Sequence, residues 1–266
     1  MLFSITLMVL AGCSALETMQ EDFGALQEDT SLLVENFFNP VAAESKRLKS
    51  DRPDDRREAL FRVTYQSWGD NDAFGPVYRL MAGADPDPAV RAAALLALAR
   101  HGGPEDAPLF QTALTSPHRV ERRAAAIFAQ RVHMPELVPF ISERSNNAEE
   151  DVQVRRDLTV ALSQYQNDRA VDALVSALDA SRYAIVEAGR SGLQHLTGMD
   201  HGTDSALWQS AINASRREGQ LFDLAKPYTF PVYDQDPGFF DQLAYWRPRP
   251  REVSGPPNGL VLDPSP

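Results

Sequence analysis

Between residues 54 and 220, apolar and small residues recur with the spacing of one helix face. Four segments each begin with a β-branched residue and carry apolar or small residues four, seven and eight positions later, which places them on one side of a helix. These segments begin at Val90, Val120, Val154 and Ile185, with steps of 30, 34 and 31 residues. We expect each segment to form the first helix of a repeating unit. A further first helix is expected between residues 54 and 68, in a register that the pattern leaves open.

The helices that follow carry a second column, formed by Pro76, Pro108, Pro139, Asp172 and Ala206. Its steps are 32, 31, 33 and 34 residues. Proline is tolerated in the opening turn of a helix, because the N–H group that it lacks has no partner there. Two columns that share one period indicate stacked helix pairs. The sequence therefore predicts an all-α fold, an α-solenoid of about five helix pairs over residues 54–220.

The turns before the first helices carry residues that cap helix N-termini. Expected N-caps are Asp87, Ser116, Asn147 and Ser181, the first two followed by a proline that can open the helix. Gly189 and Gly192 lie inside the helix expected after Ile185, which is the first helix of the final repeat. Glycine lowers the stability of a helix at such interior positions. We interpret them as positions at which a neighbouring helix comes close.

The pattern of Val-Arg, then Ala and Ala-Leu, after an Asp-Pro start resembles HEAT repeats, in particular the short bacterial kind also found in bilin-lyase-like proteins. The segment from Leu196 to Asp204, with Trp208 after it, resembles the closing repeat of many bacterial HEAT proteins. Two positions depart from the family pattern, Glu121 in the arginine column and Asp172 in the proline column. A solenoid of this kind presents an extended concave surface built from its second helices.

An apolar run from Met1 to Gly12 precedes the only cysteine of the chain, Cys13. The run is too short to span a bilayer as a helix but fits the apolar part of a signal peptide. Leu10-Ala11-Gly12-Cys13 resembles a bacterial lipobox, which implies that residues 1–12 are removed and that Cys13 becomes the acylated first residue. Several acyl chains would anchor the protein firmly. By the sorting rule of such lipoproteins, Ser14 favours the outer over the inner membrane, on the periplasmic side of the cell envelope.

Alternatives to this interpretation of the N-terminus stay open. No Lys or Arg precedes the apolar run, so either the true start lies upstream or export is inefficient. The run could also be a chance apolar N-terminus with a buried cysteine. Residues 13–53 form an acidic, helical segment that Asn39-Pro40 should end or interrupt. This segment either packs on the first repeat or serves as a spacer between the membrane and the repeats.

The C-terminal segment, residues 221–266, loses the helical period and combines aromatic residues with prolines. Such aromatic content is unusual for a disordered chain. We expect residues 221–247 to lie along the solenoid and cover an exposed face, with a short helix at 239–245. The alternative is a peptide that binds a partner. From Arg247 onward, alternating arginine and proline predict an extended, mobile segment whose last part is disordered.

Composition narrows the range of partners. The chain has 266 residues, of which 43% are apolar, enough for an ordered core. Its formal charge of −11 argues against nucleic acid as a partner, because binding phosphates requires a basic surface. A single cysteine excludes an internal disulfide and a zinc site built from cysteines.

The chain holds few residues with the pattern of a catalytic or metal site. Its five histidines are His101, His118, His133, His195 and His201, and none is followed by glutamate. HEAT-like hydroxylases with a di-iron centre use repeated His-Glu pairs, so the resemblance does not extend to that enzyme. The only compact set of ligand-type side chains is His195, Asp200, His201 and Asp204. We interpret this set as a turn with a helix cap, with a metal site as the alternative, and expect no catalytic residue, cofactor or metal.

These features predict a non-catalytic, lipid-anchored scaffold that binds another protein in the bacterial cell envelope. The first alternative is an enzyme or enzyme accessory of the bilin-lyase-like type, which export to the envelope disfavours because that chemistry is cytosolic. The second alternative is a structural spacer within an envelope assembly. Fold alone does not decide among the three.

Overall fold

A computed structural model describes residues 39–66, 68–223, 227–232 and 253–260. The chain divides into two compact units, residues 1–59 and 60–266, and each is described here by itself. Within the described residues the fold is all-α, which confirms the predicted class. The α-helices are α2 (Pro40–Arg47), α3 (Pro53–Thr64), α4 (Phe74–Ala84), α5 (Pro88–His101), α6 (Ala107–Leu114), α7 (Arg119–Arg131), α8 (Val138–Asn146), α9 (Val152–Leu162), α10 (Asp168–Leu178), α11 (Tyr183–Thr197) and α12 (Ser205–Glu218). Two short 3₁₀ helices, η1 (Pro104–Asp106) and η2 (Pro135–Leu137), precede α6 and α8.

The described part of the first unit holds α2 and the start of α3. Asn39 caps α2, because its side-chain oxygen accepts a hydrogen bond from the Ala42 amide, and Pro40 is the first helical residue. The Asn39-Pro40 pair therefore begins a helix. A helix that ends at this pair would lie within residues 1–38, which are outside the described residues. Cys13 and the predicted signal peptide lie in the same undescribed range. Arg47 donates to Glu58 at 2.9 Å, which joins α2 to α3.

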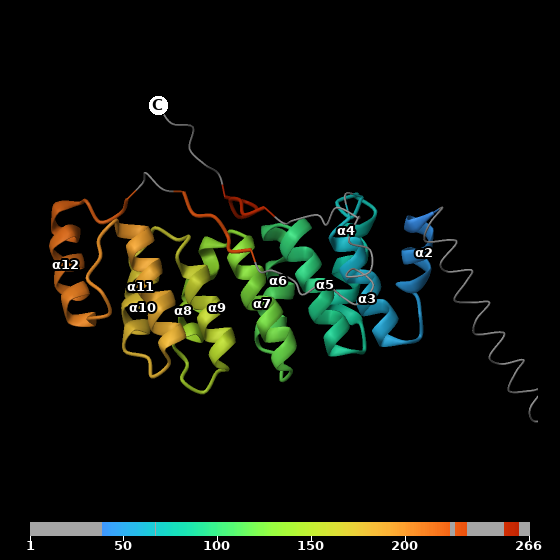
Figure 1. Cartoon of the computed structure of the whole chain (residues 1–266), viewed down its shortest axis with the longest axis horizontal. Helices are drawn as coiled ribbons and strands as arrows, with labels where there is room; N and C mark the ends of the chain where they lie inside the picture. Colours follow the sequence, from blue (N-terminus) through green and yellow to red (C-terminus); the bar gives the residue numbers. More distant parts are fainter. Residues whose placement is uncertain (1–38, 67, 224–226, 233–252, 261–266) are drawn as a thin grey trace, which may run out of the picture. The chain divides into compact units, whose positions relative to one another are not determined.

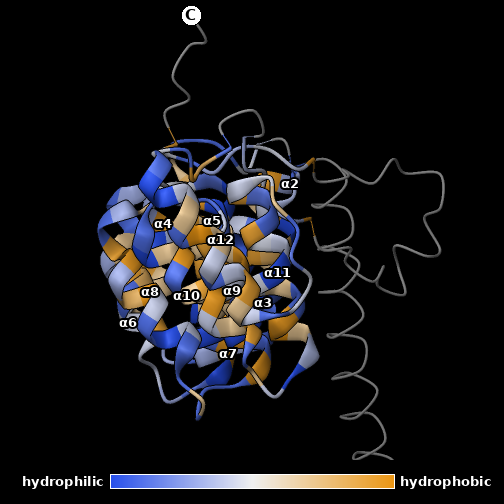
Figure 2. Ribbon diagram, turned by 90° about the vertical axis from the view of Figure 1, so that its left-hand side faces the viewer, coloured by the Kyte–Doolittle hydropathy of each residue, from blue (hydrophilic) through white to orange (hydrophobic). Residues whose placement is uncertain are grey.

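The second unit contains the repeats as antiparallel helix pairs (Figure 1). The pairs are α5/α6, α7/α8, α9/α10 and α11/α12 in chain order, and α4 precedes them. The repeat-like packing of these helices is that of the predicted all-α solenoid. Figure 2 looks along this array and shows α4, α6, α8 and α10 on one side, with α9 and α11 on the other. The unit thus has a layer of first helices and a layer of second helices.

Glycines let two neighbouring helices approach closely at the end of the array. A Cβ atom on Gly189 would lie 2.8 Å from the Leu174 carbonyl oxygen of α10. One on Gly192 would lie 2.6 Å from the Ser163 hydroxyl and 2.9 Å from the Leu174 side chain. The helical cost of both glycines is therefore offset by the packing of α11 on α10, as their positions in the sequence predict.

The structure corrects the predicted register of α7 by one residue. Val120 is 49% exposed, whereas Glu121 is only 6% exposed and lies on the buried face. Arg122 donates to the Ser116 and Pro117 carbonyls at 3.0 and 3.1 Å, in the same way that Arg91 donates to the turn before α5. Arg122, and not Glu121, is thus the counterpart of Arg91.

The cause of this error lies in the turn before α7. Ser116 and Pro117 do not begin the helix as predicted, because the N-cap is His118 and α7 starts at Arg119. Two other predicted N-caps are also wrong. Asp151, and not Asn147, caps α9, and Arg182, and not Ser181, stands at the N-cap of α11. The prediction for Asp87 is confirmed, since its carboxylate accepts from the Ala89 and Val90 amides.

Candidate protein-binding surface

The residues that form the predicted column of the second helices are exposed to solvent. The column consists of Pro76, Pro108, Pro139, Asp172 and Ala206, and every member is exposed. Each lies in the first half of its helix. A surface made from one helix of each repeat is the usual binding surface of a solenoid. The layer of second helices is therefore the first candidate for contact with another protein.

A neutral patch occupies this layer on α4 and α6. Its members are Pro76, Leu80, Gly83, Pro108, Leu109, Gln111 and Thr112. Leu80 is 66% exposed, and the Leu109 side chain lies 3.3 Å from where a Cβ on Gly83 would stand, so the two helices meet closely here. Residues 107–114 include no charged side chain. An exposed leucine among uncharged neighbours is typical of the centre of a protein–protein contact, where charges are depleted.

The only charged residue of α4 is bound to the repeat that follows. Arg79 donates to Asp106 at 2.6 Å and to Glu105 at 2.8 Å. The hydrogen bond to Asp106 raises the pKa of Arg79 above its ordinary value. This pairing compensates the charge of Arg79 and leaves the neutral patch without an unpaired cation.

The far end of the same layer is charged. Arg216 of α12 donates to Asp168 and to Asp172 of α10, both at 2.7 Å. Both carboxylates stay more than half exposed. The second-helix surface thus changes from neutral at α4 and α6 to ionic at α10 and α12.

Two tail segments, residues 227–232 and 253–260, cross the ends of the first helices, and we call them the C-terminal strap (orange to red in Figure 1). Asn258 accepts from the His133 amide at 2.8 Å and donates to the carbonyls of Arg131 and Gly102 at 2.7 and 2.8 Å. The guanidinium of Arg131 lies 4.7 Å from the ring centre of Phe230. The strap therefore connects the second and third helix pairs.

The two segments of the strap also hold one another. The Phe230 amide donates to the Gly255 carbonyl at 3.0 Å, and the Ser254 hydroxyl donates to the Phe230 carbonyl. Residues 227–232 lie along the solenoid, as predicted for 221–247. Residues 253–260 were expected to be mobile but are bound through Asn258. Residues 233–252 and 261–266, with the predicted short helix and disordered end, lie outside the described residues.

The compact histidine–aspartate set closes the last repeat. Asp200 accepts from Arg190 at 2.6 Å, and this hydrogen bond lowers the pKa of the carboxyl. Asp204 caps α12, and His201 lies edge-on to Trp208 with ring centres 5.0 Å apart. His195 is similarly placed against Tyr228 of the strap. Each member thus has a structural neighbour, and no metal-binding group of three His, Cys, Asp or Glu occurs in the described residues.

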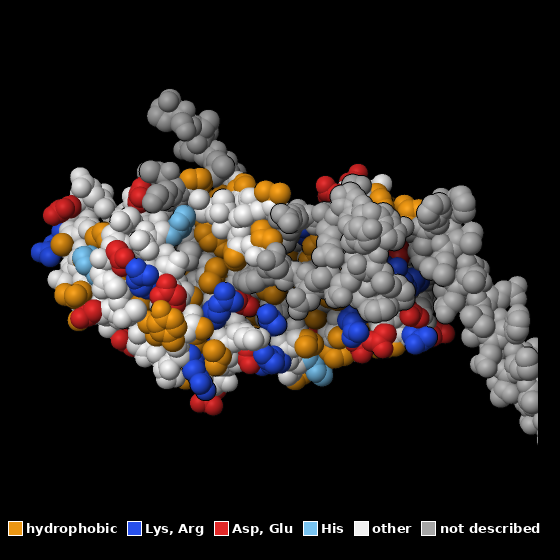
Figure 3. Space-filling view, viewed as in Figure 1, with side chains coloured by type: hydrophobic (Ala, Val, Ile, Leu, Met, Phe, Trp, Pro, Cys, Tyr) orange, Lys and Arg blue, Asp and Glu red, His pale blue; other side chains and the backbone are white. Residues whose placement is uncertain are grey.

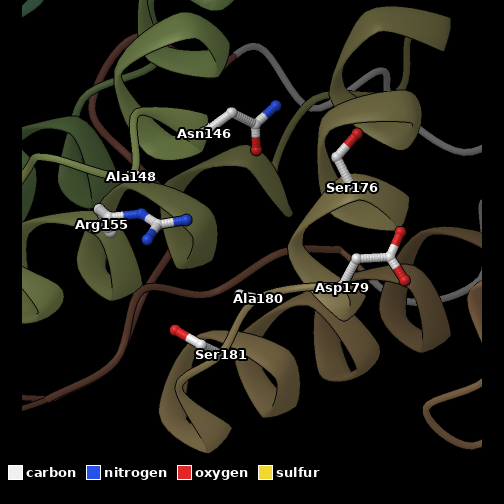
Figure 4. A pocket seen from close by; sticks show the side chains of 7 residues that line it. All are labelled: Asn146, Ala148, Arg155, Ser176, Asp179, Ala180 and Ser181. Atoms are coloured by element: carbon white, nitrogen blue, oxygen red, sulfur yellow. The ribbon is translucent and has the colours of Figure 1, made fainter.

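A pocket of about 370 Å³ lies beside the turns before α9 and α11 (Figure 4). It is lined by Asn146, Ala148, Arg155, Ser176, Asp179, Ala180 and Ser181. The Arg155 side chain points into the pocket, whereas the carboxylate of Asp179 is turned away from it (Figure 4) and accepts from Ser205 at 2.7 Å. We call this the Arg155 pocket. No sequence pattern predicts this pocket, and Ser181 was expected only as a helix N-cap.

The face in Figure 3 shows basic and acidic side chains interspersed with apolar ones. No continuous basic area is visible among the described residues of this face. None of the described helices is both long and apolar enough to cross a membrane.

Comparison with known proteins agrees with the repeat structure. A family model of HEAT repeats matches residues 44–131, a stretch that ends with α7. The helix pairs beyond the match, from α8 to α12, continue the same antiparallel arrangement. No curated protein sequence matches the chain. The match supports a HEAT-repeat protein, whose helical scaffold is suited to protein interaction.

Proposed function

We propose that the chain is a non-catalytic, lipid-anchored HEAT-repeat scaffold that binds another protein in the bacterial cell envelope. The observation that carries the proposal is the neutral patch on α4 and α6. It combines an exposed leucine with exposed prolines and uncharged polar side chains on the layer from which solenoids bind their partners. Leu80 keeps 66% of its surface exposed, which supports a role in contact with a partner.

The anchor is proposed from the sequence. Cys13 is the only cysteine of the chain, and it follows an apolar run and two small residues. Acyl chains on this residue would hold the solenoid at a membrane surface without a spanning helix. A membrane-bound scaffold would meet its partner at the membrane surface.

The non-catalytic role is proposed from the partners of the reactive side chains. His101 bonds to the Thr64 carbonyl at 2.9 Å, and His133 bonds to Gln164 at 3.1 Å. The buried acids Glu121 and Glu150 pair with arginines. Side chains with these structural partners are poor candidates for proton transfer or metal binding, because each would have to abandon a bond that supports the fold.

Site-specific photo-crosslinking in the native bacterium tests the proposal. A crosslinking residue at Leu80 or Thr112 should capture one dominant protein. The same residue at Ser191 or Gln194, exposed on α11 in the other layer, should not. The variant Leu80→Asp should reduce capture from Thr112, and Gln194→Asp should not. Equal capture from both layers, or none from α4 and α6, would favour the spacer over the binding scaffold.

A further inference from the structure

Arginines of the first helices form a ladder with acids of the next repeat. Arg91 donates to both carboxylate oxygens of Glu121, at 2.6 and 3.1 Å. One repeat later, the Nε–H group of Arg122 is shared between the two oxygens of Glu150, at 2.9 and 3.1 Å. The two acids are only 6% and 8% exposed, so both pairs are largely shielded from water. The Arg91 pair uses two donors, Nε and Nη2, and contacts of this two-donor kind are among the strongest that an arginine makes with a carboxylate.

The third arginine of this series, Arg155, has no acid partner among the described residues. Its Nε atom donates to the Ser145 carbonyl at 3.0 Å. Glu150 directly precedes the N-cap Asp151 of α9, and the residue that directly precedes the N-cap of α11 is Ser181. A serine thus stands where the preceding repeat has its glutamate. Its side chain is too short to replace that carboxylate.

The space of the missing carboxylate is open. The Arg155 pocket lies there, with the guanidinium directed into it and Asn146, Ser176 and Ser181 around it (Figure 4). The nearby acid, Asp179, faces away toward Ser205 and so does not neutralise Arg155. The guanidinium of Arg155 is thus directed into an unfilled volume whose lining also includes the amide of Asn146 and the hydroxyl of Ser181.

We propose that the Arg155 pocket binds a carboxylate group, which completes the ladder from outside the chain. The guanidinium would donate two hydrogen bonds to the carboxylate, and Ser181 or Asn146 would donate a further one, whereas the Ser176 hydroxyl already donates to the Asp172 carbonyl at 2.9 Å. The pocket is large enough for a carboxylate with a short stem, as in an aspartate or glutamate side chain. Resting on the proposed function, we assign the carboxylate to an acidic side chain of the protein partner, and a free small acid is the other source.

Nuclear magnetic resonance titration of the full-length, ¹⁵N-labelled chain tests carboxylate binding directly. The probe is N-acetylglutamate α-amide, which has one carboxylate, and the matched probe is N-acetylglutamine α-amide, which has none. The first should shift the Ala180 and Ser181 amides with a dissociation constant on the order of 10 mM, as expected for one charge-assisted contact open to water. The second should leave them unchanged. Equal shifts from both probes, or none from either, would overturn the proposal.

Two variants locate the site. Arg155→Gln removes the donor, and Ser181→Glu supplies the missing acid within the chain, so each should abolish the response to the acidic probe. Arg217→Gln and Ser210→Glu make the same charge changes at exposed positions of α12 and should preserve it. Ser181→Glu should also raise the melting temperature by about 2 °C or more, because it forms a third ladder pair. Retained binding in Arg155→Gln would place the site elsewhere.

Capture of the partner separates the two sources of the carboxylate. If the partner supplies it, Ser181→Glu should weaken crosslinking from Leu80 relative to Ser210→Glu. If a free acid supplies it, crosslinking should stay unchanged while probe binding is lost. Probe binding needs no partner, so failure of the proposed scaffold function and failure of this pocket would be seen in different measurements.

Discussion

Arg91 and Glu121 stand on successive helix pairs, and their side chains meet through two hydrogen bonds of 2.6 and 3.1 Å. The same guanidinium donates to the Asp85 carbonyl at 2.7 Å and to the Pro86 carbonyl at 3.1 Å. The hydrogen bond to Glu121 raises the pKa of Arg91 above its ordinary value. One side chain thus fixes the turn before its own helix and the position of the next repeat.

The variant Glu121→Gln should lower the free energy of unfolding by about 2 kcal/mol, because it leaves a largely buried arginine without its charged partner. Arg155→Gln removes an arginine that has no acid partner and should cost less than about 0.5 kcal/mol. Urea unfolding followed by circular dichroism gives both values. Equal costs in the two variants would mean that the ladder contributes no more than an ordinary surface arginine.

The ladder also shows where sequence periodicity stops being informative. Pro76, Pro108 and Pro139 lie in the first turns of their helices, as predicted, because proline has a narrow range of helical positions. The predicted register of α7 is wrong by one residue, because α7 is rich in alanine and such a shift still leaves small residues on the buried face. Only the partner of Glu121, 30 residues earlier, distinguishes a buried acid from an exposed one. Periodicity within one helix carries no such information.

The Arg155 pocket and the C-terminal strap depend on contacts between distant residues. Ser181 lines the pocket, and it directly precedes a helix N-cap as Glu150 does one repeat earlier. Asn258 contacts Gly102 across 156 residues. No local pattern predicts such a contact, since an Asn near prolines is typical of any turn.

The variant Gly192→Ala should destabilise the chain by about 1 to 3 kcal/mol. Its new methyl group would stand 2.6 Å from the Ser163 hydroxyl and 2.9 Å from Leu174, so α10 and α11 would have to move apart. Gly75→Ala is the matched control, since its nearest neighbour would lie at 3.5 Å, an ordinary contact, and alanine favours the helix. Thermal unfolding of both variants checks this. A stabilising effect at Gly192 would contradict the close approach of the two helices.

Removal of residues 233–266 should expose the end of α7. The His133 amide donates to the Asn258 carbonyl, and without this acceptor its hydrogen exchange should accelerate at least about tenfold. The Gly198 amide donates to the Gln194 carbonyl within α11 and should keep its exchange rate. Hydrogen exchange by nuclear magnetic resonance measures both. An unchanged rate at His133 would show that the strap does not protect this end of the helix.

Alkaline pH should destabilise the fold through its buried tyrosines. Burial raises the pKa of Tyr165 above its ordinary value of 10.0, as it does for Tyr78. The unfolded chain therefore loses these protons first, so stability is present below pH 10 and falls as the pH rises beyond it. Tyr165→Phe should flatten this fall by about 1.4 kcal/mol per pH unit.

The same variant should be less stable than the parent near neutral pH. The Tyr165 hydroxyl accepts from the Met134 amide at 3.1 Å, and phenylalanine leaves this buried donor without its partner. Urea unfolding at a series of pH values separates the two effects. The missing hydrogen bond lowers the free energy of unfolding at every pH, whereas the missing titration changes how steeply this free energy falls with pH. If the free energy of unfolding falls equally steeply with alkaline pH in Tyr165→Phe and the parent, the pKa of Tyr165 does not differ between the folded and unfolded chain.

The variant Cys13→Ser should release the protein from the membrane fraction. A serine cannot carry a thioether-linked lipid, and none of the described helices could span a bilayer in its place. Fractionation of the native bacterium with an antibody to the chain measures the distribution, and Ser14→Ala serves as the control because it leaves the cysteine intact. If the scaffold binds a membrane-bound partner, a residual fraction should persist in Cys13→Ser and be lost when Leu80→Asp is added. A membrane fraction unchanged by Cys13→Ser, with or without Leu80→Asp, would refute the lipid anchor.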